Sequence, residues 1–196
     1  MKKLFCIESD WDNQPQIEKS MLPLLECIKG VYPAFEYIYR TANTKEELEY
    51  CLKKFKSIRK QSNDFYTIVF CGHGRMGKFS LGDEKLGSVL TIKALAEICQ
   101  SVCKKLFLNQ HVHFDSCSIL KTSESNLNLF TEITGAEAVT GFSKNVDFID
   151  SYALEMVLFE ALINSNNIKN ALNKFYKKHE TGLCKINGFT MFGNFL

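Results

Sequence analysis

Two short segments of the chain combine an apolar run with a reactive side chain at its end. FYTIVFCGHG (65–74) ends with His73 between two glycines, and HVHFDSC (111–117) ends with Cys117 two residues after Asp115. Each run is short and rich in β-branched and aromatic residues, which predicts a strand. A histidine beside a cysteine supplies the base and the nucleophile of acyl transfer. The two segments therefore make the chain a candidate cysteine peptidase if the fold brings their ends together.

Cys117 differs from the other cysteines in its polar surroundings. Asp115, Ser116, Ser118 and the stretch 121–126 predict that its thiol reaches solvent, and a helix beginning near Ser118 would favour the thiolate through its dipole. Most of the other seven cysteines sit in apolar runs and are interpreted as small core residues, at positions 6, 27, 51, 71, 99, 103 and 184.

The glycines around His73 also fit a catalytic position. Gly72 and Gly74 would let a substrate backbone approach closely, and a glycine amide can point at a developing oxyanion. The plainer interpretation is a glycine-rich turn that happens to contain a histidine.

The hydrophobic pattern alternates between strand-like and helix-like segments. Strands are predicted at 4–7, 35–39, 66–71, 111–115 and 136–142 with a last candidate at 185–192, and helices at 17–29, 44–56, 91–105, 123–134, 147–164 and 168–179. Residues 78–90 are expected to form a small hairpin or an irregular excursion. This order predicts one α/β domain over 1–196, a three-layer α/β/α sandwich with a mostly parallel central sheet. Ligands bind beyond the carboxyl ends of such strands, where His73 and Cys117 both fall.

The two strand-end motifs resemble those of the caspase-like (clan CD) superfamily of cysteine peptidases, which includes caspases, metacaspases and CHAT-domain proteins. Residues 68–74 match its hydrophobic strand followed by His-Gly, and 112–117 match its strand ending in the nucleophilic cysteine. CIESDW (6–11) and VTGFSKNVDFIDSYALE (139–155) are similar to a bacterial caspase-like family to which no activity is assigned. The chain is shorter than most caspases and metacaspases, and it has neither an evident calcium-binding acid cluster nor a glycine directly after Cys117.

The resemblance implies a mechanism and a specificity. Cys117 would form a thioester, His73 would transfer protons, and the amides of Gly74 and Cys117 would stabilise the oxyanion. In metacaspases the acid two residues before the cysteine lines a pocket for a basic side chain, which here implies Asp115 and cleavage after arginine or lysine. A second acid would come from the end of the first strand, where the chain offers Glu8, Asp10 and Asp12, and Ser143 would form another wall. Alternatively, Asp115 caps the next helix or pairs with a lysine.

Composition narrows the setting of the protein. With 24 basic and 22 acidic residues the net charge is +2, too balanced to predict nucleic-acid binding. The first residues are too short for a signal-peptide core and no segment is long enough to span a membrane, so we expect a cytoplasmic protein with reduced thiols. A protein or peptide substrate, no cofactor, and a role in bacterial stress or defence signalling are expected, with activation by a partner or ligand left open and no oligomeric state predicted.

Two other interpretations remain. His111, His113, Asp115 and Cys117 alternate and would share one side of a strand, but they span too much length to gather one metal ion without a turn. The alternative function is a catalytically silent or ligand-activated binding or signalling module, because a fold alone does not establish activity. A nucleotide-binding domain is disfavoured, since neither GxGxxG nor a Walker motif occurs.

Overall fold

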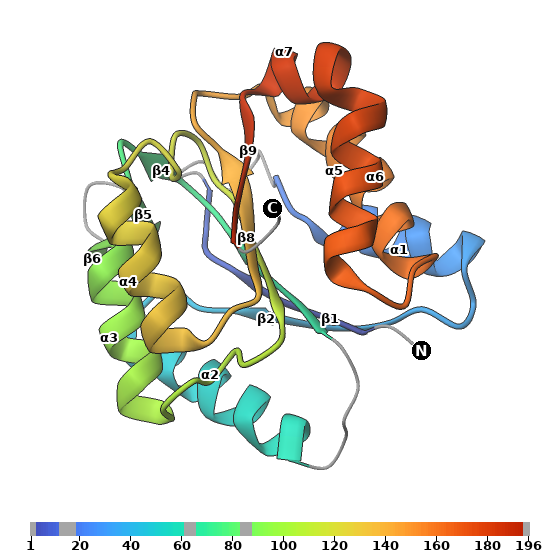
Figure 1. The fold of residues 1–196 in the computed structure, drawn as a ribbon. Coiled ribbons are helices and arrows are strands. Elements are labelled where there is room, and N and C mark those ends of the chain that lie inside the picture. The colour runs from blue at the N-terminus through green and yellow to red at the C-terminus, as the bar shows by residue number, and fades with distance from the viewer. Residues whose placement is uncertain (1–2, 12–18, 61–65, 83–87, 194–196) are drawn as a thin grey trace.

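The structure is a computed structural model that describes residues 3–11, 19–60, 66–82 and 88–193 (Figure 1). Its strands are β1 (Lys3–Glu8), β2 (Glu36–Thr41), β3 (Tyr66–Cys71), β4 (Gly74–Arg75), β5 (Lys78–Leu81), β6 (Ser88–Thr91), β7 (His111–Asp115), β8 (Ala138–Phe142) and β9 (Phe189–Gly193). Its helices are α1 (Leu22–Val31), α2 (Lys45–Lys60), α3 (Ile92–Val102), α4 (Glu124–Thr134), α5 (Phe148–Ile163), α6 (Ile168–His179) and α7 (Lys185–Asn187), with a π-helical turn at Glu180–Cys184. No helix among these residues is long and apolar enough to cross a membrane.

A six-stranded sheet forms the middle layer, in the order β2-β1-β3-β7-β8-β9. The first five strands are parallel, and β9 is antiparallel to β8. Helices α1, α5 and α6 cover one face of the sheet, and α2, α3 and α4 cover the other (Figure 1). The predicted α/β sandwich with a mostly parallel sheet is therefore confirmed.

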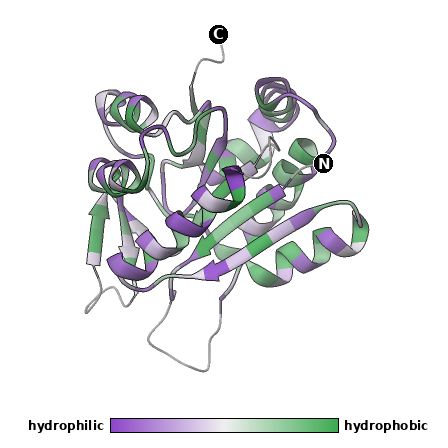
Figure 2. Ribbon diagram, turned by 90° about the horizontal axis from the view of Figure 1, so that it is seen from below, coloured by the Kyte–Doolittle hydropathy of each residue, from purple (hydrophilic) through white to green (hydrophobic). Residues whose placement is uncertain are grey.

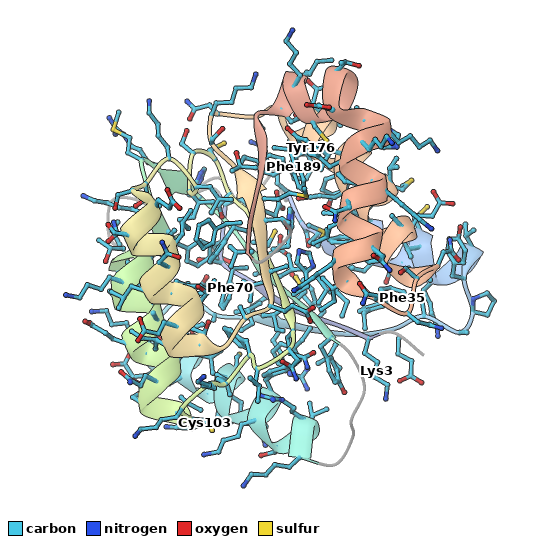
Figure 3. The ribbon with its side chains drawn as sticks, in the orientation of Figure 1. Lys3, Phe35, Phe70, Cys103, Tyr176 and Phe189 are labelled. Atoms are coloured by element: carbon cyan, nitrogen blue, oxygen red, sulfur yellow. The ribbon has the colours of Figure 1, made fainter. Side chains whose placement is uncertain are left out.

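Each face of the sheet has its own hydrophobic core, because successive side chains of a strand point to opposite faces. In β3, Ile68 and Phe70 join the core under α2, α3 and α4, whereas Val69 and Cys71 join the core under α1, α5 and α6. Phe70 stacks on Phe114 of β7 with ring centroids 5.4 Å apart, and Figure 3 shows it inside the molecule between the two helical layers. In Figure 2 the strands carry both hydrophobic and hydrophilic colours, and the helices alternate along their length, as expected for helices with one buried face.

Local sequence signals fix several helix ends. Thr44 and Glu47 form a capping box at the start of α2, in which each side chain accepts a hydrogen bond from the backbone of the other. Thr91 caps α3 and Ser123 caps α4 through their hydroxyl oxygens. The excursion expected at 78–90 is a small antiparallel sheet, β4-β5-β6, that begins earlier, at Gly74.

Several predicted boundaries are wrong, among them the end of α2, which continues to Lys60 rather than stopping at 56. Helix α1 begins at Leu22 rather than at position 17, and α3 ends at Val102 rather than at 105. The strand predicted over 185–192 is divided, because Lys185–Asn187 is helical and Gly188 takes a left-handed conformation with φ +60° before β9 starts at Phe189. Glycine is the residue that adopts this conformation without strain, so it ends the helix and turns the chain into the strand.

Candidate functional site

The register of β3 and β7 places the two motif ends beside each other. Cys71 and Asp115 are the last paired residues of these strands, and the amide of Gly72 donates to the carbonyl of Asp115 at 3.1 Å. His73 and Cys117 each follow two residues after that pair. The structure therefore brings the predicted histidine and cysteine to the same edge of the sheet, at the carboxyl ends of neighbouring parallel strands.

Gly74 lies directly against the backbone of Cys117. A Cβ atom at Gly74 would come within 2.5 Å of the Cys117 carbonyl oxygen and 3.1 Å of its amide nitrogen. Gly74 and Phe79 face each other in the β4–β5 hairpin as a pair without mutual backbone hydrogen bonds. The neighbouring hydrogen bond runs from the amide of Ser80 to the carbonyl of His73. The Gly74 N–H therefore points away from β5. The two amides expected to form the oxyanion hole thus belong to adjacent backbone segments.

His73 is half-buried and is oriented by Trp11, which follows β1. Its Nε2 donates to the carbonyl oxygen of Trp11, and the indole ring meets the imidazole edge to face with centroids 5.7 Å apart. Because Nε2 carries the hydrogen in this arrangement, Nδ1 is the nitrogen that is able to accept a proton.

Cys117 is half-buried, and its sulfur contacts the loop after β8. The amide of Val146 donates to Sγ at 3.4 Å, and the thiol lies 3.7 Å from the Val146 carbonyl oxygen. The helix expected to open near Ser118 is absent, because α4 begins only at Glu124 and Ser118 takes a left-handed conformation with φ +52°. The expectation of a helix dipole at the thiol is therefore wrong, and the N–H donor at the sulfur is the amide of Val146.

Asp115 lies beneath this edge and is only 1% exposed. Its carboxyl accepts from the Cys71 thiol at 2.9 Å and lies near the carboxyl of Glu155 in α5, so it neither caps a helix nor pairs with a lysine. Burial, and after it the Glu155 charge, raises the pKa of Asp115 well above its ordinary value.

The other predicted pocket residues are dispersed. Asp10 is exposed and accepts from the Asn43 side chain at 2.8 Å, and Asp12 lies outside the described residues. Ser143 is half-buried and its hydroxyl donates to the Gly188 carbonyl at 2.9 Å. Asp10 and Ser143 are thus held by contacts within the chain, and their predicted roles in a substrate pocket stay predictions.

A chain of buried polar groups continues from Asp115 across the sheet. His113 contacts Glu155 Oε1 at 3.0 Å and the Thr140 hydroxyl at 2.8 Å, and His111 bonds to the same hydroxyl at 2.8 Å. Burial raises the pKa of Glu155 to about 8 and lowers that of His113 to about 4, so the histidine is neutral and the acid pair holds a proton near neutral pH.

Sequence reasoning missed Glu155, Thr140 and the role of Trp11. His111, His113 and Asp115 show the alternation that places them on one face of β7, but their partners lie 27 or more positions away. The ring nitrogens of the two histidines are taken up by threonine and glutamate. Within the described ranges, no three side chains of the metal-binding types form a group that would hold a metal ion.

Known structures share this fold at low sequence identity. A secreted C11 cysteine protease from Bacteroides thetaiotaomicron, "iotapain", is 13% identical with a TM-score of 0.55, over 92% of this chain and 63% of its own. Caspase-1 from Spodoptera frugiperda is 9% identical with a TM-score of 0.56, over 98% of this chain and 86% of its own. Raptor from Chaetomium thermophilum is 11% identical with a TM-score of 0.50, over 88% of this chain and 20% of its own.

The chain thus spans less than two thirds of two of these proteins, and the likeness shows a caspase-like fold. No curated protein matches the sequence. Residues 1–193 match a family described as a family of unknown function, DUF6642. The chain, with its caspase-like fold, therefore belongs to the DUF6642 family.

Proposed function

We propose that this protein is a cysteine endopeptidase in which Cys117 is the nucleophile and His73 transfers the protons. The observation that carries the proposal is the equal offset of both residues from the paired Cys71 and Asp115, with Gly74 pressed against the Cys117 backbone. The caspase-like fold supports it, because two proteins of similar fold are a cysteine protease and a caspase.

The geometry supports the following steps. Nδ1 of His73 takes the proton from the Cys117 thiol, and Sγ attacks the peptide carbonyl carbon while the electron pair moves to the oxygen. The amides of Gly74 and Cys117 stabilise that oxyanion, and each well-placed donor contributes roughly 3 to 4 kcal/mol in such sites. When the C–N bond breaks, the leaving amine takes the proton from His73 and a thioester remains. Water then loses a proton to His73, attacks the thioester, and the thiol regains its proton.

We propose that the enzyme cleaves after arginine or lysine, as the sequence resemblance implies. Asp115 and Glu155 lie under the catalytic edge, and Asp10 is exposed beyond β1. A cationic side chain that approaches these two buried acids would expel the proton that they hold near neutral pH, because the ionised pair then gains a counter-charge. Preference for basic over neutral substrates is therefore expected to rise with pH.

A latent state is the second candidate, and one contact favours it. The Cys117 thiol donates to the Val146 carbonyl at 3.7 Å rather than to His73. A partner or ligand that moves the Val146 loop would free the thiol for His73. The setting expected from the sequence, a bacterial cytoplasm and stress or defence signalling without nucleic acid or membrane, belongs to this same proposal.

Labelling with peptidyl electrophiles tests the proposal. Probes with arginine, lysine, aspartate or alanine next to the warhead are incubated with the wild type, Cys117→Ala and His73→Ala, and intact mass is measured. One adduct on the wild type is expected, none on Cys117→Ala, and a greatly slowed reaction on His73→Ala. The basic probes are expected to react fastest.

Two other cysteines provide matched controls. Cys27 is exposed and Cys103 is half-buried, so each offers a thiol of similar or greater access without a histidine motif. Cys27→Ala and Cys103→Ala should label like the wild type. An adduct that persists in Cys117→Ala, or the absence of any adduct together with no hydrolysis of basic peptides, would refute a constitutively active peptidase.

A further inference from the structure

The last residue of β1, Glu8, is a buried acid surrounded by donors. Its side chain is 3% exposed, although it lies at the edge of the sheet that carries His73 and Cys117. Oε1 accepts from the Trp11 indole N–H at 2.8 Å and from the Met21 amide at 2.9 Å. Oε2 accepts from the hydroxyls of Ser20 at 2.8 Å and Tyr39 at 2.5 Å. Four N–H or O–H donors therefore converge on one carboxylate, which matches its acceptor capacity.

These donors come from both ends of the segment that joins β1 to α1. Trp11 lies near the start of this segment, three residues after β1 ends. Ser20 and Met21 lie at its end, and Met21 directly precedes helix α1. Tyr39 belongs to the neighbouring strand β2. Glu8 thus ties the two ends of the connection to the sheet. Burial, and after it the bond to Glu8, raises the pKa of the Tyr39 hydroxyl above its ordinary value.

Trp11 carries this anchorage to the candidate catalytic histidine. Its indole is fixed at one side by Glu8 and packs edge to face on Phe148 at 6.0 Å, while its main-chain carbonyl accepts from Nε2 of His73. No direct contact between Glu8 and His73 is needed, because the tryptophan residue touches both. The carbonyl selects the Nε2–H tautomer, which leaves Nδ1 for the thiol.

We propose that Glu8 is the positioning residue of His73, acting through Trp11. The proposal rests on the peptidase function proposed above. From its place in the sequence, Glu8 is one of three acids that could line the pocket for a basic substrate side chain. Its four acceptor positions are instead used by the chain itself, so it fixes the residue that orients the imidazole and does not meet the substrate.

The chemistry of the donors makes a leucine and a glutamine substitution differ. Glu8→Leu keeps most of the volume and leaves the indole and the Met21 amide without an acceptor, and each buried donor without a partner destabilises this arrangement. In Glu8→Gln the amide oxygen can serve those two N–H groups. The hydroxyls of Ser20 and Tyr39 can then turn to accept from the amide nitrogen. Leucine is expected to release Trp11, and glutamine is expected to retain it.

The experiment reads the tryptophan, the histidine and the thiol separately. Trp11 is the one tryptophan of the chain and His73 is one of four histidines, so the emission spectrum and the ¹⁵N imidazole spectrum are simple to assign with His73→Ala. For Glu8→Leu we expect red-shifted emission, a mixture of His73 tautomers, and labelling of Cys117 about tenfold slower at unchanged half-saturating probe concentration. For Glu8→Gln the rate of Cys117 labelling should stay within about twofold of the wild-type rate.

Glu160→Gln is the matched control, because Glu160 accepts from the Tyr32 hydroxyl at 2.7 Å on the exposed side of α5 and should change none of the readouts. An unchanged emission or an unchanged His73 tautomer in folded Glu8→Leu would overturn the proposal. If Glu8→Leu does not fold, Trp11→Phe replaces it, since it removes the indole N–H but keeps the carbonyl, and the His73 tautomer must then shift. If the wild type neither labels nor hydrolyses peptides, the peptidase function fails while the emission and the tautomer still decide the role of Glu8.

Discussion

At the scale of single residues, the site depends on a glycine, Gly74, which has no Cβ atom. Gly74 sits where β4 begins, and its Cα faces the carbonyl and amide of Cys117. No other residue type fits, because any Cβ there would contact backbone atoms that cannot rotate away. Glycine at this position thus serves close approach of two chain segments, and the amides of both segments are left side by side.

Gly74→Ala is therefore expected to disable the site. The new Cβ would lie 2.5 Å from the Cys117 carbonyl oxygen, so the hairpin or residue 117 must move by a large fraction of an ångström. Labelling of Cys117 by a basic electrophile should slow about a hundredfold. Gly30→Ala is the control, because a Cβ at Gly30 in α1 meets nothing within 4 Å. Labelling of Gly74→Ala at the wild-type rate would contradict the proposed oxyanion geometry.

The sequence predicts where His73 and Cys117 lie in the fold better than it predicts their surroundings. His73 and Cys117 follow apolar strands, and this local signal suffices to place them at one edge of a parallel sheet. The contacts of Trp11 and Val146 with these residues join segments 62 and 29 positions apart. Such contacts arise from the tertiary fold, and no periodicity in the sequence indicates them.

At the scale of elements, the C-terminal strand covers the buried polar chain. Phe189 begins β9 and is 5% exposed, and its ring lies 6.4 Å from that of His113 and 5.3 Å from that of Phe175 in α6. The alternating pattern of 185–192 predicted a longer strand than β9, because it does not reveal the short helix and the glycine turn that precede Phe189. Alternation shows which residues share a face, but a left-handed glycine changes the direction of the chain without altering that pattern.

Phe189→Ala should destabilise the protein by about 3 to 5 kcal/mol, since it leaves a cavity among packed aromatic rings. Phe192→Ala provides the comparison on the same strand, because Phe192 is half-buried on the opposite face and should cost markedly less. Urea unfolding followed by circular dichroism measures both changes. Equal losses for the two variants would show that β9 is held by its backbone pairing with β8 rather than by Phe189.

At the scale of the whole molecule, one face of the central sheet is unusual in being partly polar. Parallel strands covered on both sides are generally apolar, yet β7 presents two histidines and an aspartate to α5. Their alternation was visible in the sequence. The partners of the two histidines, Thr140 and Glu155, were not visible there, because they lie on other elements. The fold class was thus predictable from the order of elements, while this network required the packing of α5 on the sheet.

The network makes stability depend on pH. Asp115 and Glu155 have raised pKa values in the folded protein, so above about pH 4.5 the folded state binds more protons than the unfolded state and stability falls as pH rises. His111 and His113 have lowered pKa values and act in the opposite direction, but only below about pH 6.5. Between about pH 6.5 and about pH 8 only the carboxyl effect of this network remains.

Glu155→Gln should therefore flatten the fall in unfolding free energy over this range. One proton corresponds to a slope of at most about 1.4 kcal/mol per pH unit, and the glutamine removes the group whose pKa is about 8. Urea unfolding at several pH values measures the slope, with Glu160→Gln on the exposed side of the same helix as the control. If Glu155→Gln keeps the wild-type slope, Glu155 is not the group that releases the proton over this range. If the wild type itself shows no fall, the buried acids hold no proton near neutral pH, a cationic substrate would meet an already ionised pair, and the preference for basic residues would not change with pH.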